Sequence, residues 1–113
     1  MQVLFKSRDP QASALRSFTE QRVQFVLRRL GWLVPRAEVH LSDVNGPRGG
    51  VDKRCQVALK TDGAGTVVVA AVASDWRTAL DDALARAARF LLRMWRRGSQ
   101  SRRMRQRLAS MER

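Results

Sequence analysis

The sequence predicts an α+β fold in which two helices pack on one face of a four-stranded sheet, in the order β-α-β-β-β-α. Four segments have the apolar or alternating pattern of strands, and two longer segments carry an apolar stripe at helical spacing. Turns that contain glycine or proline separate most of these segments. Because each helix has one apolar stripe, both are expected to cover the same sheet, and the 113 residues suit one domain.

The N-terminal part is predicted to form a short strand followed by a helix. Residues 1–5, MQVLF, are apolar and favour a strand. Asp9 or Ser13 can cap a helix that we predict over residues 12–30, and Gly31 is its expected stop. At about 100° per residue, one arc of this helix collects the side chains that we place towards the core: Leu15, Thr19, Val23, Val26 and Leu30.

Three further strands are predicted in the middle of the chain. Residues 36–44 and 53–61 alternate between apolar and polar side chains, which indicates half-buried strands. The apolar run 66–73, TVVVAAVA, follows a turn at 62–65 and predicts a strand that lies centrally or is buried on both faces. The alternating side chains expected to point inward are Ala37, Val39, Leu41, Cys55, Val57 and Leu59.

The second helix is predicted to run from about residue 75 to 97, with Ser74 or Asp75 as its cap. A Gly-Ser pair follows, and the apolar face is lost. We therefore predict a domain over residues 1–97 and a basic, partly helical tail over residues 98–113. The helix stripe that faces the core comprises Leu80, Leu84, Ala87, Leu91 and Met94.

The chain is strongly basic, with a net charge of +12, and 19 of its 22 basic residues are arginine. Arginine presents a planar fork of donors that fits phosphate groups and stacks on bases. The expected partner is therefore a polyanion, with nucleic acid as the first candidate and an acidic membrane surface as the second.

The positive charge is concentrated at the C-terminal end, where residues 86–113 hold ten arginines and one acid, Glu112. A solvated helix face normally mixes both signs, because like charges one turn apart repel each other. The second helix instead shows an arginine face, which favours binding of a polyanion over a merely solvated face. Its members fall within an arc of about 100°, well away from the apolar stripe: Arg86, Arg89, Arg93, Arg96 and Arg97.

The first helix carries a smaller patch away from its core arc, formed by Phe18, Arg22, Phe25 and Arg29. Aromatic rings beside arginines suit stacking on unpaired bases. The alternative is that the two phenylalanines pack beneath the loops, and the sequence leaves both interpretations open.

The glycine-rich stretch 45–54, NGPRGGVDKR, differs from a phosphate-binding loop, because no Gly-Lys-Ser/Thr follows it to open a helix. Asp43, Asn45 and Asp52 lack the spacing of a calcium loop. We interpret the stretch as a connection between two strands. Contact with RNA is the alternative, through three cations: Arg48, Lys53 and Arg54.

The sequence shows no pattern that suggests catalysis, so we expect no enzyme, no cofactor and no small-molecule substrate. Cys55 and His40 are the only residues of their types, which excludes an internal disulfide and argues against a four-ligand zinc site. The N-terminus resembles neither a signal peptide nor a membrane span, so we expect a cytoplasmic protein that does not enter the membrane.

Three stretches carry a resemblance to a known family: ALRSFTEQRV at 14–23, VNGPRGGVDKRCQV at 44–57 and SDWRTALDDALARAARFLLR at 74–93. With these stretches the chain resembles the short form of the ribosome hibernation-promoting factor / ribosome-associated inhibitor A family, the ribosomal subunit interface proteins. The resemblance covers residues 1–97 and the same order of strands and helices.

The resemblance implies a specific function. Members bind the small ribosomal subunit between head and body, occupy the sites of messenger RNA and of the A- and P-site transfer RNAs, and so silence idle ribosomes under stress. By position, the contacts with ribosomal RNA would fall on Arg16, Arg22, Arg28, Arg86, Arg89, Arg93 and Arg97. Arg96 joins them through its place on the arginine face, and weaker contacts are expected from Arg102, Arg103 and Arg105 in the tail.

The chain also departs from the family pattern. Arg77 stands where a tyrosine is usual, and Phe25, Phe90 and Trp95 stand where polar residues are common, which indicates an extra apolar contact. The tail is too short for the dimerisation domain of long members, so we predict a monomer.

The main alternative is a general RNA-binding module, similar to a double-stranded-RNA-binding domain, that acts on another structured RNA. Such a module places basic residues at the start of its second helix, where this chain has Asp75, Asp81 and Asp82. A protein of the membrane surface is a second alternative, but the apolar stripe of the last helix is needed for the core.

Overall fold

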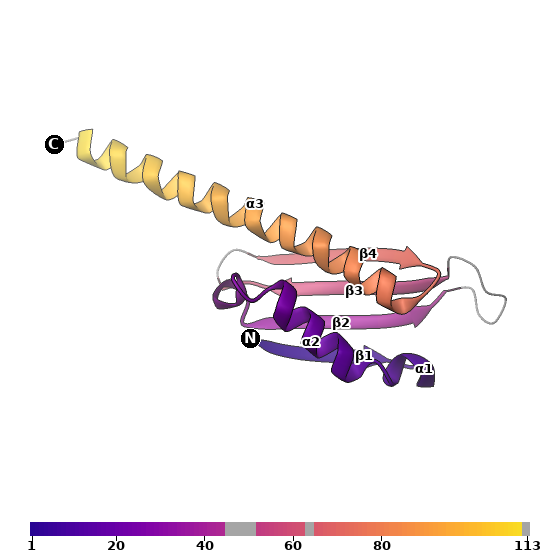
Figure 1. Ribbon diagram of the computed structural model, residues 1–113. Coiled ribbons are helices and arrows are strands. Elements are labelled where there is room, and N and C mark those ends of the chain that lie inside the picture. The colour runs from indigo at the N-terminus through magenta and orange to yellow at the C-terminus, as the bar shows by residue number, and fades with distance from the viewer. Residues whose placement is uncertain (45–51, 63–64, 112–113) are drawn as a thin grey trace.

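Four strands form one sheet, and helices cover one of its faces (Figure 1). The computed structural model describes residues 1–44, 52–62 and 65–111, with side chains described as far as Gly98. The predicted α+β fold is confirmed. In chain order the elements are β1 (Gln2–Ser7), α1 (Pro10–Ser13), α2 (Arg16–Val26), η1 (Gly31–Leu33), β2 (Arg36–Asp43), β3 (Lys53–Lys60), β4 (Thr66–Ala73) and α3 (Trp76–Met111).

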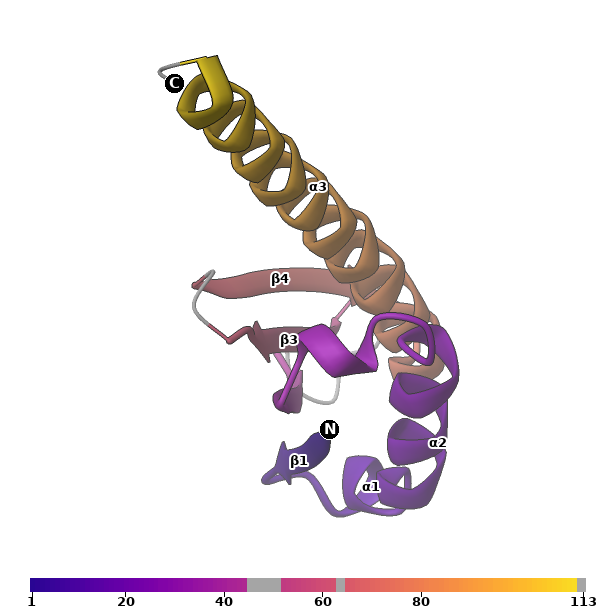
Figure 2. The ribbon, with the colours of Figure 1, turned by 90° about the vertical axis from the view of Figure 1, so that its left-hand side faces the viewer.

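The sheet is mixed and follows the order β1-β2-β3-β4. β1 runs parallel to β2, with Phe5 opposite Val39, whereas β2, β3 and β4 are antiparallel, with Val57 opposite both Val39 and Val69. A parallel pair requires a long crossover connection, which α1 and α2 provide here. Figure 2 shows α2 and α3 on the same side of the sheet, with α2 near β1 and α3 near β4.

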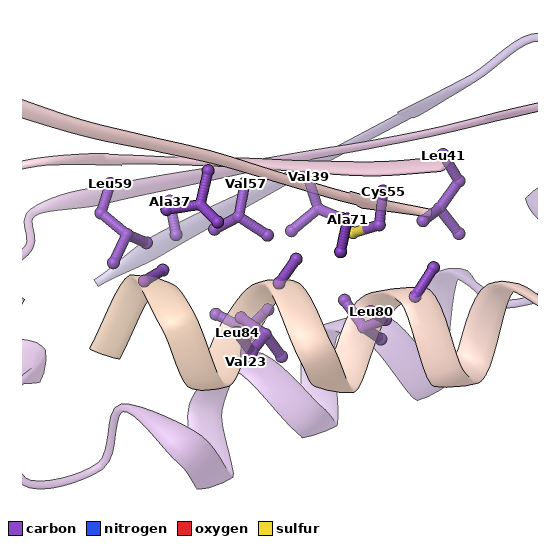
Figure 3. Packing of buried hydrophobic residues seen from close by; sticks show 14 of the residues in the cluster. Val23, Ala37, Val39, Leu41, Cys55, Val57, Leu59, Ala71, Leu80 and Leu84 are labelled. Carbon is purple, nitrogen blue, oxygen red and sulfur yellow. The ribbon is translucent and has the colours of Figure 1, made fainter. Parts of the chain in front are cut away.

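The core lies between this sheet face and the two longer helices. Figure 3 shows the labelled side chains of β2 and β3 on the helix side of the sheet, and Leu80 and Leu84 of α3 beside Val23 of α2 in the helical layer. Burial of each large apolar side chain stabilises the fold by roughly 1.5–3 kcal/mol, so this layer is the main source of stability. The predicted inward side chains of β2 and β3 are confirmed as fully buried: Ala37, Val39, Leu41, Cys55, Val57 and Leu59.

The prediction that residues 66–73 form a central or doubly buried strand is wrong. β4 is an edge strand, and its side chains alternate between buried and exposed. Val68 is 58% exposed and Val72 is 44% exposed, because both lie on the sheet face that the helices leave uncovered. Uniform apolar character conceals a one-sided strand when the outward positions also hold valine or alanine.

The single helix predicted over residues 12–30 is also wrong, because the structure divides this segment. α1 ends at Ser13, α2 ends at Val26, and η1 follows. Asp9 does cap α1, since its Oδ1 accepts a hydrogen bond of 2.8 Å from the backbone N–H of Gln11. Because α2 ends at Val26, Leu27 is buried in the core, although it lies off the arc that was predicted to face the core. On that arc Thr19 and Val23 are buried, while Leu15, Val26 and Leu30 are half-buried.

α3 is capped as predicted but continues past its predicted end. The Asp75 carboxylate accepts hydrogen bonds of 2.8 Å from both the backbone N–H and the hydroxyl of Thr78. The helix continues to Met111 rather than ending near residue 97, and it projects beyond the sheet (Figure 1). One glycine costs a helix only about 1 kcal/mol, and good helix formers surround Gly98. A separate role for residues 98–113 stays a prediction.

Candidate nucleic-acid interface

The arginine face lies on the outer side of α3. All five of its side chains are exposed, while Leu80, Leu84 and Leu91 on the opposite side of the helix are buried. The same helical spacing therefore produces both faces, as the sequence predicts. None of the five guanidinium groups forms an ion pair with an acid in the part of the chain that the structure describes. The face is Arg86, Arg89, Arg93, Arg96 and Arg97.

The arginine face adjoins the free edge of β4. Arg86 Nη1 donates a hydrogen bond of 3.4 Å to the backbone oxygen of Ala70. The Arg93 guanidinium lies 5.7 Å from the centroid of the exposed Phe90 ring. These contacts are weak, and they leave most of the guanidinium donors free for an incoming ligand. Exposed arginines at one-turn spacing can each bind a phosphate oxygen in a charge-assisted hydrogen bond.

Arg22, which the sequence places on an RNA-binding patch, is engaged within the fold. Its Nε and Nη2 atoms each lie 3.0 Å from Oδ1 of Asp81, so it links α2 to α3. The pair is partly solvent-exposed, which allows exchange with a phosphate at modest cost. RNA contact by Arg22 stays a prediction, and it requires competition with Asp81.

The two phenylalanines of the smaller patch separate in the structure. Phe18 is half-buried and packs against the core, with the Arg77 guanidinium 4.7 Å from its ring centroid. Phe25 is exposed, and Arg28 lies 4.5 Å from its ring centroid. The loop-packing interpretation therefore describes Phe18, whereas Phe25 remains accessible to a base.

The remaining predicted cations of the helical layer differ in their surroundings. Arg16 is exposed at the start of α2, with its guanidinium 5.5 Å from the Phe5 ring centroid. Arg28 is exposed just after α2, and its Nη1 donates to the backbone oxygen of Phe25 over 3.3 Å. Both lie on the helical side of the molecule, but neither shares an element with the arginine face.

Lys53 is held by structural contacts at the junction of β2, β3 and α3. Its Nζ lies 2.7 Å from Asp43 Oδ2, 3.6 Å from Asp52 Oδ2 and 4.8 Å from the ring centroid of Trp76. The hydrogen bond with Asp43 is the main reason that the pKa of Lys53 is raised. The buried Asp52 carboxylate has no hydrogen-bond partner among the described residues, which makes the Lys53 charge more important to it. An RNA role for Lys53 would require disrupting this arrangement.

The other predicted contacts lie apart from α3 or beyond what the structure describes. Arg54 points its Nη1 at Oε1 of Gln56, at 3.2 Å, and the alternation of β3 puts both side chains on the uncovered sheet face. Arg48 lies outside the described residues. The backbone of α3 includes three further predicted contacts whose side chains lie outside the described part: Arg102, Arg103 and Arg105.

Sequence reasoning missed two features of this surface. Arg77 covers Phe18, and Trp32 of η1 contacts Trp95 of α3, with ring centroids 6.3 Å apart. Each contact joins residues that are far apart in the chain, so no local spacing could reveal it. The only hint of these contacts in the sequence is that Arg77 and Trp95 differ from the residue types usual at their positions in the family.

The exposed groups of this surface suit the binding of a polyanion. Within the described ranges, no three His, Cys, Asp or Glu side chains gather in a way that could hold a metal ion. In the same part of the chain, no helix combines the length and apolar character needed to cross a bilayer. What the surface offers is a row of exposed guanidinium groups with aromatic rings nearby, an arrangement that suits a polyanion with flat bases.

Comparison with known proteins places these features in a wider context. The model of the family described as "Sigma 54 modulation protein / S30EA ribosomal protein" matches residues 11–97. A solved ribosomal subunit interface protein from Coxiella burnetii is similar at a TM-score of 0.63 and 18% identity, over 82% of this chain and 96% of that one. The Protein Y N-terminal domain of Thermus thermophilus is similar at a TM-score of 0.61 and 23% identity, over 82% and 98%. A search of curated proteins found no match. At these identities the two solved structures demonstrate a shared fold.

Proposed function

The chain belongs to the Sigma 54 modulation protein / S30EA ribosomal protein family, and from this premise we propose that it is a ribosome-associated translation inhibitor, or hibernation factor. It binds the small ribosomal subunit at the decoding region. There it occupies the sites of messenger RNA and transfer RNA, so that idle ribosomes are kept silent. It acts as a monomer in the cytoplasm, where ribosomes are found.

The observation that carries this proposal is the arginine face of α3. Its five cations are exposed, lie on one side of a helix that is packed against the sheet by its other side, and have no acidic partner among the described residues. A packed helix fixes the backbone positions of these arginines, so binding has to order only their side chains and not the chain itself. Ribosomal RNA is the polyanion that the family membership indicates.

The proposed binding is mainly electrostatic. Contacts with phosphates dominate, so the affinity for the small subunit falls steeply as salt is added. Each arginine that neutralises a phosphate contributes about one unit to the slope of log affinity against log salt. Arg16 and Arg28 add contacts from the α2 side, and Arg22 adds one only where a phosphate displaces Asp81.

A sedimentation experiment with purified small subunits tests the proposal. A variant with Arg86→Glu, Arg89→Glu and Arg93→Glu should lose co-sedimentation at low salt while its circular dichroism stays that of the parent. The matched control carries the same change of charge on three exposed cations away from α3: Lys6→Glu, Arg8→Glu and Lys60→Glu. The control should still co-sediment. If both variants lose co-sedimentation equally, the loss follows from the change in net charge, which would contradict a specific role for the arginine face.

A further inference from the structure

Two exposed tryptophans, one from η1 and one from α3, meet at the surface of the molecule. The rings of Trp32 and Trp95 lie 6.3 Å apart between centroids, with their planes at 89°, so the edge of one ring meets the face of the other. Trp32 is 69% exposed and Trp95 is 43% exposed. The third tryptophan, Trp76, is only 7% exposed, and its indole N–H donates to the backbone oxygen of Ser42.

The exposed pair is not needed to close the core. Leu27 and Leu91 are buried in the core cluster, and neither exposed tryptophan belongs to that cluster. An edge-to-face contact uses the face of only one ring, so the other ring faces stay open to solvent. Singly exposed apolar side chains are ordinary, whereas two large aromatic rings held against each other form a defined apolar surface. Such a surface fits a flat apolar group.

Arginines lie close to both tryptophans along the chain. Arg96 follows Trp95 directly, Arg29 precedes Trp32 by less than one helical turn, and both arginines are exposed. A second copy of this chain would carry the same net charge of +12 and would be repelled. The charge and the open ring faces together indicate a partner that offers flat groups and negative charges in alternation, which is the composition of a single-stranded nucleic acid.

We propose that Trp32 and Trp95 form a stacking site for an unpaired nucleobase of RNA, with the adjoining phosphates on the neighbouring arginines. The inference deepens the proposed function and rests on it, because both require RNA as the partner. The base must be unpaired, since the bases of a duplex are already stacked on one another and present no free face. The site adds a base-dependent contribution that guanidinium–phosphate contacts alone do not supply.

The test compares two probes that have equal charge but differ in their bases. The first is a single-stranded oligouridylate, and the second is a ribose-phosphate oligomer of the same length without bases. In filter binding, Trp32→Ala and Trp95→Ala should each weaken oligouridylate binding by about 5- to 150-fold, the range expected for loss of one stacked base. Binding of the base-free oligomer should stay that of the parent. Trp32→Phe, which keeps a ring, should recover part of the loss.

Tryptophan fluorescence provides an independent measurement on the full chain. Oligouridylate should quench the emission of the parent, because two of the three indoles are exposed. In a Trp32→Phe, Trp95→Phe variant only the buried Trp76 still emits, so oligouridylate should leave its signal unchanged. Circular dichroism checks that each variant is folded.

The outcomes separate this inference from the proposed function. Suppose that the alanine variants bind both probes as the parent does, while the triple glutamate variant of the arginine face loses both. The stacking site is then wrong and the proposed function stands. If small-subunit binding fails but oligouridylate binding depends on both tryptophans, the proposed ribosomal function is wrong and the stacking site stands. A shift of the parent's emission to shorter wavelength with vesicles of anionic phospholipid, without quenching by oligouridylate, would overturn the inference in favour of a membrane contact.

Discussion

Arg22 of α2 and Asp81 of α3 form an ion pair across the two helices, with Nε and Nη2 of the guanidinium each 3.0 Å from Oδ1 of the carboxylate. The pair fixes α2 against α3 and at the same time neutralises one cation close to the proposed RNA surface. It therefore has two separable effects, one on stability and one on binding.

Asp81→Asn should lower the stability of the fold slightly and raise the affinity for the small subunit. Loss of a partly exposed pair costs about 0.2–1 kcal/mol, so the urea midpoint should fall only slightly. The affinity for the small subunit should rise at low salt, because Arg22 becomes free to bind a phosphate. Asp82→Asn is the matched control, since it removes the same charge one position along α3 and leaves the ion pair intact. If both variants bind alike, the gain comes from net charge and Arg22 makes no contact.

Leu84→Ala tests the assignment of the helix faces. Leu84 is fully buried against the sheet, so the change should lower the free energy of unfolding by roughly 2–5 kcal/mol. Phe90→Ala, at an exposed position on the same helix, should have a much smaller effect. Urea denaturation of both variants makes the comparison. A loss below about 0.5 kcal/mol for Leu84→Ala would show that the buried face of α3 has been assigned wrongly.

Cys55 should make the fold sensitive to alkali. Burial raises the pKa of its thiol to about 12, whereas a thiol in the unfolded chain titrates near its ordinary value of about 8.5. The folded state thus favours the neutral thiol, and this stabilisation is complete below about pH 8.5 and is lost as the pH rises towards about 12. Between about pH 8 and about pH 10 the parent should lose roughly 1–2 kcal/mol more than Cys55→Ala in urea denaturation. Parallel loss in both proteins would contradict a buried neutral thiol.

Asp75 should stabilise α3 in a way that acid removes. The hydrogen bonds donated by Thr78 lower the pKa of the Asp75 carboxyl, so the charged form is favoured in the folded state. This stabilisation is present above the pKa of the unfolded carboxyl, about 3.9, and is lost as the pH falls through the lower folded pKa. Asp75→Asn keeps a capping side chain without the charge, and it should unfold at lower urea concentration than the parent at neutral pH. The difference should disappear in acid, and a difference that persists there would have another cause.

Much of this fold could be predicted from the sequence, because the strongest signals are local. The period-two alternation around Val39 and Val57 identified the inward faces of β2 and β3, and the opposite stripes of α3 followed from helical spacing. The edge position of β4 was hidden, since valine occupies its exposed positions as well as its buried ones. The break in the first predicted helix was also hidden, because the residues around Leu15 carry no strong stop signal.

The candidate site was predictable only in part, for a related reason. The arginine face belongs to one helix, so its geometry is contained in the spacing of the residues. Other contacts depend on how separate elements pack. These are the ion pair of Arg22 with Asp81, the ring contact of Trp32 with Trp95, and the contacts of Lys53 with Asp43 and Trp76. Such contacts are determined by the tertiary structure and cannot be predicted from the periodicity of the sequence.

The most direct test of the central claim asks whether the arginine face excludes transfer RNA from the small subunit. Labelled transfer RNA is bound to purified small subunits with messenger RNA, and the amount retained on a filter is measured as protein is added. The parent should displace transfer RNA at low salt, as should the control with Lys6→Glu, Arg8→Glu and Lys60→Glu. The variant with Arg86→Glu, Arg89→Glu and Arg93→Glu should leave transfer RNA bound. If that variant displaces transfer RNA as well as the parent does, the arginine face of α3 is not the surface that meets the ribosome.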